Sequence, residues 1–355
     1  MPILQILILA GGAGSRLWPI SRQQNPKQFQ KLLGQKTLFE LALARAQKIV
    51  AAEQIFVATN KKFLRLAIKQ APQVPRCNFF AEPSCRDTAA CLGFAAQILA
   101  QRAAESVMAV FYADHLIHDN QELARKVRAA ALVAQQGKIA IIEIQSQFPA
   151  TQFGWVQVGQ QKAAVRGEPV YELKKFIEKP ELKRAQIFHK HKSFFWNTGL
   201  YVVAPQVLLQ ALQQYLPTTF RHLQRLQANF ANKKLVAAEY AACPKISLDF
   251  GVMEKIAKDR VAILPARLGW SDVGTFATLK DELTRPQQNC VNTKLVAVQA
   301  TGNFVQTSQK KLVALLGCHD LVVVETADVL LVCPRARSAE VKKIIKKLGV
   351  QSEFL

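Results

Sequence analysis

The sequence predicts an α/β protein in which a Rossmann-like, doubly wound mixed sheet precedes a small β-rich domain. Over residues 3–145, short apolar runs that suit buried strands alternate with longer segments that suit helices, which is typical of a sheet covered on both faces. After residue 285, short apolar runs follow one another, and we expect a β-helix-like unit there. We therefore place one domain at 1–284 and a second at 285–355.

The elements of the first half follow from local signals. A capping box at Thr37 and Glu40 opens the first helix, and Pro72 ends the next one. Asp87 is expected to cap the third helix, and Gly137 to end the fourth. These helices alternate with buried strands that we expect at 3–10, 55–60, 78–83, 107–114 and 138–144.

The later elements are less regular. Residues 150–205 hold glycine, proline and aromatic residues between short apolar runs, so we expect short strands and loops that wall a binding site. Residues 205–284 return to helices, with one strand at 261–266. The tail is predicted to hold short strands and a basic final helix, at 294–300, 312–317, 321–326, 329–334 and 339–348.

The chain is strongly basic, with 47 Lys and Arg against 25 Asp and Glu and a formal net charge of +22. Such a surface suits a polyphosphate substrate or nucleic acid, or else serves solubility alone. No nucleic-acid-binding signature accompanies the charge, so we expect no nucleic-acid partner and assign most of it to solubility. Seven cysteines without a CxxC pair disfavour disulfides and zinc, and suit a reducing cytoplasm. No apolar run is long enough to predict a membrane span.

A glycine-rich turn follows the first strand and offers backbone N–H groups to a phosphate chain. It contains Gly11, Gly12, Gly14 and Ser15. The turn lacks the last glycine of a dinucleotide-binding fingerprint and the Lys-Ser/Thr ending of a Walker A loop. A bare turn of this kind is structural about as often as it is functional.

The residues that continue the turn carry more information. Arg16 offers a planar fork for phosphate oxygens, and Lys27 adds a compact charge. Pro19 and Pro26 resist helix formation and favour an extended loop. Two cations beside backbone donors suit a transition state in which charge builds on phosphate oxygens, so we expect Arg16 and Lys27 to be catalytic. The alternative is that both are solvated surface charges.

The run GGAGSRLWPISRQQNPKQF at 11–29 resembles the signature of the mannose-1-phosphate guanylyltransferases, and more broadly that of the hexose-1-phosphate nucleotidyltransferases. The resemblance covers about residues 1–284 well and the tail loosely, and it implies that the first domain is a nucleotidyltransferase domain. Further segments match the family in order, at 82–90, 113–117, 153–159, 176–180, 195–202, 247–255 and 269–276.

The resemblance implies a catalytic Mg²⁺ held by Asp114 and Asp272. Mg²⁺ prefers one or two carboxylates, with water and phosphate oxygens completing an octahedron. By spacing alone both residues would be ordinary cap or turn acids, so the flanking motifs carry this assignment. His115 is expected to support Asp114 or to be structural, because no partner stands at zinc-ligand spacing.

In the family, the segment that matches Glu82 and Pro83 reads the base. A carboxylate can accept hydrogen bonds from N1–H and the exocyclic amine of guanine, which favours GTP over ATP or UTP. Asp87 and Thr88 continue the nucleotide-binding segment, but the family usually has asparagine where this chain has Asp87. The added charge either caps a helix, weakens GTP binding or alters base choice. Tyr112 is a second departure, since a proline is common at that position.

The resemblance assigns the sugar to Gly154, Glu178, Lys179 and Asn197, with Asp249 as a further candidate. Glutamate and asparagine can bind vicinal hydroxyls as paired acceptors and donors, and Lys179 can meet the sugar phosphate.

These expectations combine into one reaction. We expect the chain to transfer GMP from GTP to α-D-mannose 1-phosphate by a Mg²⁺-dependent in-line displacement that releases pyrophosphate. Two alternatives stay open. The chain could use another sugar 1-phosphate or another nucleoside triphosphate in the same reaction, or it could be a homologue that binds sugar nucleotides without turnover. The tail lacks the extension of relatives with an isomerase domain, so transferase activity alone is expected. We also expect a cytoplasmic protein without a membrane partner, in which the tail supports a homodimer.

Overall fold

The computed structural model describes all residues except 1–2, 13, 104, 309–310, 350–351 and 355. The chain forms two compact units. Unit 1 comprises Met1–Gly11, Ala42–Tyr112 and Ile117–Trp270, and unit 2 comprises Gly12–Leu41, Ala113–Leu116 and Ser271–Leu355. Each unit has a hydrophobic core of its own. This division by packing groups the glycine-rich turn with the tail, whereas the sequence pattern divides the chain only near residue 285.

Unit 1 is built on a sheet of nine strands in the order β3-β2-β1-β4-β9-β6-β10-β8-β7, counted over the described residues. Strands β1 to β4 pair in parallel, and β9 enters antiparallel between β4 and β6, so the sheet is mixed as predicted. The strands are β1 Ile3–Leu9, β2 Ile55–Asn60, β3 Phe79–Glu82, β4 Ser106–Tyr112, β6 Ile139–Gln145, β7 Trp155–Val165, β8 Glu168–Ile177, β9 Phe194–Val203 and β10 Val261–Ala266.

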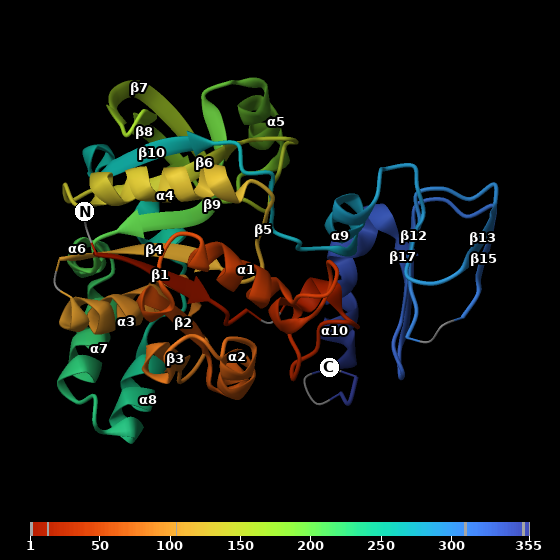
Figure 1. The fold of residues 1–355 in the computed structure, drawn as a ribbon, viewed down its shortest axis with the longest axis horizontal. Helices are drawn as coiled ribbons and strands as arrows, with labels where there is room; N and C mark the ends of the chain where they lie inside the picture. The colour runs from red at the N-terminus through yellow and green to blue at the C-terminus, as the bar shows by residue number, and fades with distance from the viewer. Residues whose placement is uncertain (1–2, 13, 104, 309–310, 350–351, 355) are drawn as a thin grey trace. The chain divides into compact units, whose positions relative to one another are not determined.

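Both faces of the central strands are covered, which explains why their sequences are continuously apolar. In β1, Leu7 and Leu9 join the core that contains α3, while Ile6 and Ile8 on the opposite face are also buried. In Figure 1, α4 lies across β6, β9 and β10, and α3 packs against α6 and α7. The helices are α1 Leu38–Gln47, α2 Leu64–Gln70, α3 Asp87–Arg102, α4 Asn120–Ala134, α5 Leu182–Lys190, α6 Pro205–Tyr215, α7 Pro217–Ala228 and α8 Lys233–Ala242.

The prediction for residues 150–205 was wrong in one respect. We expected short strands and loops, but β7, β8 and β9 are among the longest strands and belong to the main sheet. The pairing of β7 with β8 contains several register shifts, which interrupt the regular alternation of buried and exposed residues that would have revealed the strands.

Two of the predicted helix ends need correction. The capping box is confirmed, because Thr37 and Glu40 exchange backbone-to-side-chain hydrogen bonds of 2.7 and 3.1 Å. Asp87, however, is the first residue of α3 rather than its cap, and its carboxylate accepts the N–H of the adjacent Thr88, at 2.8 Å. The fourth helix ends at Ala134 and not at residue 136.

Within the described residues, no helix combines the length and apolar character needed to cross a bilayer.

The core of unit 2 joins the beginning of the chain to its end. Leu17 and Trp18 are buried with Phe276, Phe304 and Val322 in one cluster. The indole N–H of Trp18 donates to the carbonyl of Phe354 at 2.7 Å. The unit also contains α9 Phe276–Leu283 and α10 Lys342–Leu348, and the chain passes between the units at β5 Leu116–Ile117 and β11 Trp270–Ser271.

The tail has the ladders of a β-helix, as predicted (Figure 1). Parallel pairs join Phe304 to Val322 and Leu295 to Val313, an advance of 18 residues (322 − 304 and 313 − 295), whereas Cys290 pairs with Phe304 after only 14 (304 − 290). With so few coils, this spacing leaves no visible repeat in the sequence. The strands are β12 Cys290–Val291, β13 Leu295–Val298, β14 Phe304–Gln306, β15 Val313–Leu316, β16 Leu321–Glu325 and β17 Leu330–Pro334.

Candidate active site

The glycine-rich turn folds back on itself within unit 2. Gly14 has φ of 62°, a conformation that glycine adopts without strain, and a Cβ there would lie 2.6 Å from Cγ of Lys27. The carbonyl of Gly12 accepts a hydrogen bond of 2.9 Å from the side chain of Gln28. Ser15 begins a short 3₁₀ turn, Ser15–Leu17, and a second one spans Lys27–Phe29. The glycine is therefore required so that the lysine can lie against the turn.

Both predicted cations meet the predicted metal ligands. The side chain of Lys27 is buried, and its Nζ lies 2.8 Å from the carboxylate of Asp114. The same Nζ donates to the carbonyl of Asp272 at 3.1 Å. A guanidinium nitrogen of Arg16 lies 3.5 Å from the carboxylate of Asp272. Four residues that are far apart in sequence thus form one cluster, which we call the phosphate half of the site.

The acids of the phosphate half suit a divalent cation. Burial alone would raise the pKa of Asp114, but the charge and hydrogen bond of Lys27 and the charge of His115 outweigh it, so the pKa lies below its ordinary value. Asp272 is held by the N–H of Gly274 at 3.1 Å. Two carboxylates, of which one is strongly favoured as the anion, match the hard-oxygen donor set of Mg²⁺.

The predicted base-reading segment lies in unit 1, where Glu82 is enclosed by its neighbours. Glu82 is buried, and its Oε2 accepts the hydroxyl hydrogen of Tyr240 at 2.6 Å. Burial raises the pKa of Glu82, and the nearby charge of Asp87 raises it further against the hydrogen bonds of Tyr240 and Cys91. Asp87 is exposed with φ of 64°. The charge of Asp87 therefore acts on the pKa of Glu82, the residue that is predicted to read the base.

Neighbours of Glu82 connect this segment to the rest of unit 1. The Oγ1 of Thr88 accepts the N–H of Leu248 at 2.9 Å, which ties the start of α3 to the residue before Asp249. Gly11 passes close to Oε1 of Glu82, and Pro83, which follows β3, is half-buried.

The predicted sugar residues also come together in unit 1. A Cβ on Gly154 would lie 2.5 Å from Oε2 of Glu178 and 3.1 Å from Cβ of Asn197. The amide nitrogen of Asn197 donates to Asp249 at 2.8 Å, and the ammonium of Lys179 pairs with Glu178. The pKa of Glu178 is raised by burial and by the charge of Asp249, and the lysine only partly offsets this. We call this group the sugar half of the site.

The sequence did not reveal several residues that hold these groups in place. The hydroxyl of Tyr201 donates to Asp249, and the side chain of Glu254 accepts the backbone N–H of Glu178 at 2.8 Å. Tyr240, which binds Glu82, lies in a helix and is fully buried. A tyrosine within an apolar strand or helix has the pattern of a core residue, so no sequence signal distinguished them.

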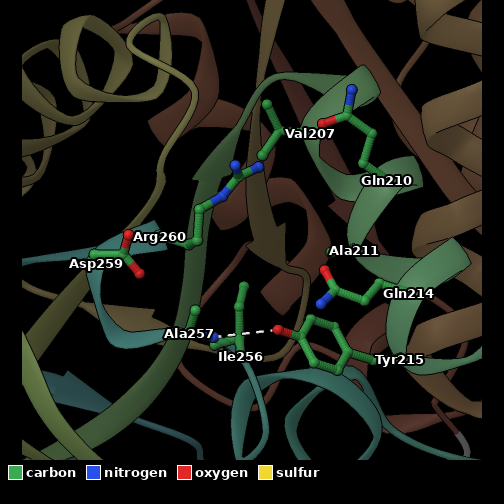
Figure 2. A pocket seen from close by; sticks show the side chains of 9 residues that line it. All are labelled: Val207, Gln210, Ala211, Gln214, Tyr215, Ile256, Ala257, Asp259 and Arg260. Atoms are coloured by element: carbon green, nitrogen blue, oxygen red, sulfur yellow. Dashed lines mark hydrogen bonds between the residues drawn. The ribbon is translucent and has the colours of Figure 1, made fainter.

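A pocket of about 280 Å³ in unit 1 is separate from these residues (Figure 2). It lies between α6 and the segment 256–260, and Tyr215 accepts the N–H of Ala257 there at 3.2 Å. Gln210, Gln214 and Arg260 at its rim are exposed. It contains none of the predicted site residues, so it is not the candidate active site.

Comparison with known proteins assigns both parts of the chain to known families. The family model for nucleotidyl transferases matches residues 5–288, and that for the MannoseP isomerase/GMP-like beta-helix domain matches 293–348. The alginate biosynthesis protein AlgA of Pseudomonas putida KT2440 is 32% identical over 351 residues, which are 97% of this chain and 71% of that protein. The mannose-1-phosphate guanylyltransferase of Escherichia coli K12 is 30% identical over 352 residues, 96% of this chain and 73% of that protein.

Among solved structures, the mannose-1-phosphate geranyltransferase of Thermus thermophilus matches with a TM-score of 0.86 and 31% identity. The match covers 97% of this chain and 99% of that one. These similarities confirm the resemblance that the sequence motifs indicated, and they extend it over the tail.

Proposed function

Because the chain belongs to the nucleotidyl transferase family and is a sugar-phosphate nucleotidyltransferase, we propose that it transfers GMP from GTP to α-D-mannose 1-phosphate. The products are GDP-mannose and pyrophosphate. The observation that supports this most is the phosphate half, where Lys27 and Arg16 meet Asp114 and Asp272. The name of the Escherichia coli relative supports the choice of sugar and nucleotide.

The chemistry needs positioning and charge neutralisation more than acid–base catalysis. An oxygen of the sugar phosphate is already ionised, so it attacks the α-phosphorus without a general base. The new P–O bond forms as the bond to pyrophosphate breaks, and pyrophosphate takes the electron pair. Arg16 and Lys27 stabilise the charge on the α-phosphate oxygens, and the backbone N–H groups of the turn orient the chain of phosphates.

Asp114 and Asp272 are the residues that would hold Mg²⁺. When bound, the ion would neutralise charge on the phosphate oxygens. Lys27 keeps Asp114 ionised beforehand, so the ligand does not have to lose a proton. Removing divalent ions with EDTA should abolish turnover, and added MgCl₂ should restore it; full activity in EDTA would contradict the metal assignment.

Base selection is proposed to depend on Glu82. Its hydrogen bond to Tyr240 and the nearby charge of Asp87 both influence how it could accept from guanine. Asp87→Asn would restore the residue that is usual in the family. We expect this change to lower the KM for GTP by about threefold, because the loss of the Asp87 charge favours the ionised form of Glu82, the better hydrogen-bond acceptor. An unchanged KM for GTP would show that Asp87 acts only on α3.

The experiment that tests the proposal is pyrophosphate release over a panel of nucleoside triphosphates and sugar 1-phosphates with Mg²⁺. We expect kcat/KM to be highest for GTP with mannose 1-phosphate. A higher value with another pair would correct the substrates and leave the reaction class intact. Absence of pyrophosphate with every pair would leave only binding without turnover.

A homodimer through the tail is a further proposal. On β13 and β15, the side chains of Val296, Val298 and Leu316 are 52%, 52% and 75% exposed. Adjacent apolar side chains on a parallel ladder suit burial against a second copy. Leu316→Glu should therefore convert dimer to monomer in light scattering, and a monomeric wild type would contradict the proposal.

A further inference from the structure

A buried acid lies directly beneath the sugar half and has no role in the proposed chemistry. Glu143, in the centre of β6, is fully buried. Its Oε2 accepts the backbone N–H of Thr198 at 2.8 Å. Its Oε1 is also buried and has no hydrogen-bond partner among the described residues. Burying a carboxyl group with so few partners costs stability, so its presence in the middle of a sheet requires an explanation.

The pairing of β6 with β9 is irregular at this residue. Ile142 pairs with Leu200 and Ile144 pairs with Trp196, so Glu143 alone stands opposite three residues of β9, namely 197–199. A bulge of this kind re-aims the side chains that it carries, and such bulges are common beside active sites. Here the bulge contains Asn197, a residue of the sugar half.

The bulge is held by a set of short-range hydrogen bonds. Thr198 Oγ1 donates to the carbonyl of Ile142 at 2.6 Å and accepts the N–H of Leu200 at 3.1 Å. The N–H of Asn197 donates to Gly154 at 2.8 Å. The N–H of Thr198, at the middle of the bulge, donates to the carboxyl of Glu143. Without that acceptor, a backbone donor would be buried unsatisfied.

The conformation of the bulge determines where Asn197 points. Its Oδ1 accepts the N–H of Gly199 at 3.1 Å, and its Nδ2 donates to Asp249 at 2.8 Å. The amide is therefore fixed at both ends, one of them by the backbone of the bulge itself. A shift of the bulge would move this amide away from Asp249 and Glu178.

We propose that Glu143 is a positioning residue for the sugar site: its carboxyl fixes the β9 bulge, which aims Asn197 and thereby sets the affinity for the sugar 1-phosphate. This role rests on the proposed function. Burial raises the pKa of Glu143 well above its ordinary value, and the charge of Asp249 adds to this against the Thr198 hydrogen bond. A neutral carboxyl is an adequate acceptor, so the role requires shape and one oxygen, not charge.

The test compares variants of Glu143 that differ in one property. Glu143→Gln keeps the length and an acceptor oxygen, and should leave the KM for the sugar 1-phosphate within about twofold of the wild type. Glu143→Leu removes the acceptor, and should raise that KM about tenfold while the KM for the nucleoside triphosphate stays within about twofold. Glu143→Asp withdraws the acceptor by one methylene and provides the same test if the leucine variant does not fold.

A matched control separates positioning from loss of stability. Ile139 lies on the same face of β6 and is also buried, and Ile139→Val removes one methyl group from the core without touching the bulge. Amide exchange of the segment 196–200, followed by mass spectrometry, should become about tenfold faster in Glu143→Leu and stay unchanged in Ile139→Val.

Two results would overturn the inference. One is unchanged exchange over 196–200 in Glu143→Leu; the other is faster exchange together with an unaltered affinity for the sugar 1-phosphate. Calorimetry of sugar 1-phosphate binding keeps this outcome apart from that of the proposed function. A wild type that binds the sugar phosphate without turnover would contradict the proposed function alone, and weaker binding by Glu143→Leu would then still support the positioning role.

Discussion

The phosphate half and the sugar half use the same kind of side chain in opposite ways. In the phosphate half, each acid lies against a cation, and the pKa of Asp114 is lowered. In the sugar half, Lys179 pairs with Glu178, but burial and the charge of Asp249 still raise the pKa of Glu178. The first arrangement suits a polyanion and a metal ion, whereas the second presents hydrogen-bond acceptors to hydroxyl groups.

The largest effect should come from the cation at the centre of the phosphate half. Lys27→Met removes the charge from between Asp114 and Asp272, and we expect kcat to fall about 10²–10³-fold because one preorganised electrostatic contact is lost. Lys27→Arg serves as the control that keeps the charge, and should retain more activity. Steady-state pyrophosphate release measures both. A kcat near the wild-type value in Lys27→Met would exclude this residue from the chemistry.

Removing the amide from the sugar half should instead change binding. Asn197→Ala is expected to raise the KM for the sugar 1-phosphate about 10- to 30-fold, because the amide that would bind the sugar is lost and Asp249 loses a hydrogen bond that holds it. The KM for the nucleoside triphosphate should change little. Initial rates with each substrate varied in turn give both constants. If the two KM values rose together, the separation of the site into two halves would be wrong.

Substituting a glycine in each half should separate the two halves in the same way, with smaller effects on the kinetic constants. Gly154→Ala places a methyl group 2.5 Å from Glu178, so we expect a several-fold increase in the KM for the sugar 1-phosphate. Gly14→Ala places one 2.6 Å from Lys27 on a left-handed residue, which should lower kcat and cost about 1 kcal/mol of stability. Thermal unfolding accompanies the kinetics, since a variant with lost stability but normal constants would contradict this reading.

The smallest effect expected is on the pH dependence of the free energy of unfolding. Asp114 in the phosphate half and Glu143 beside the sugar half should change it with opposite sign as the pH rises. Ionised Asp114 contributes stability above about pH 3.9 that is lost as the pH falls through its lowered pKa. Glu143 contributes stability below about pH 4.3 that is lost as the pH rises through its raised pKa.

Urea unfolding from about pH 2 to pH 9 measures this difference. The deficit of Asp114→Asn should shrink toward low pH, whereas Glu143→Gln should gain on the wild type toward high pH. Curves that run parallel to the wild type for both variants would show that neither carboxyl is shifted on folding.

The two cations of the phosphate half could be predicted from the sequence because their signal is local, whereas Asp114 and Asp272 followed only from the family resemblance. Arg16 and Lys27 stand in one short run with glycine and proline, and their charges have no plausible use in a core. The alternation of strands and helices likewise revealed β1, β2 and β4, because strands buried on both faces are continuously apolar. Both predictions depend on signals that lie within a few residues of each other.

The supports of the sugar half could not be predicted in this way. Glu143 acts through a bulge on a residue 55 positions away, and a bulge depends on pairing that no local pattern records. Tyr201 binds Asp249, which is 48 positions away. Asp87 illustrates the opposite error, since its helix-capping pattern was plain but the backbone there is left-handed. The preference of aspartate for the capping position did not decide the backbone conformation of Asp87, because tertiary context can override local propensity.

The core of unit 2 has a consequence for synthesis on the ribosome. Leu17 and Trp18 are translated early in this sequence, yet the partners that bury them, such as Phe276, Phe304 and Val322, follow at least 258 residues later (276 − 18). Domains generally fold as units in the order of their synthesis, but this one cannot close until its distant half has left the exit tunnel. In a nascent chain, the segment 14–29 should therefore remain accessible to proteases and chaperones long after β1 has been made.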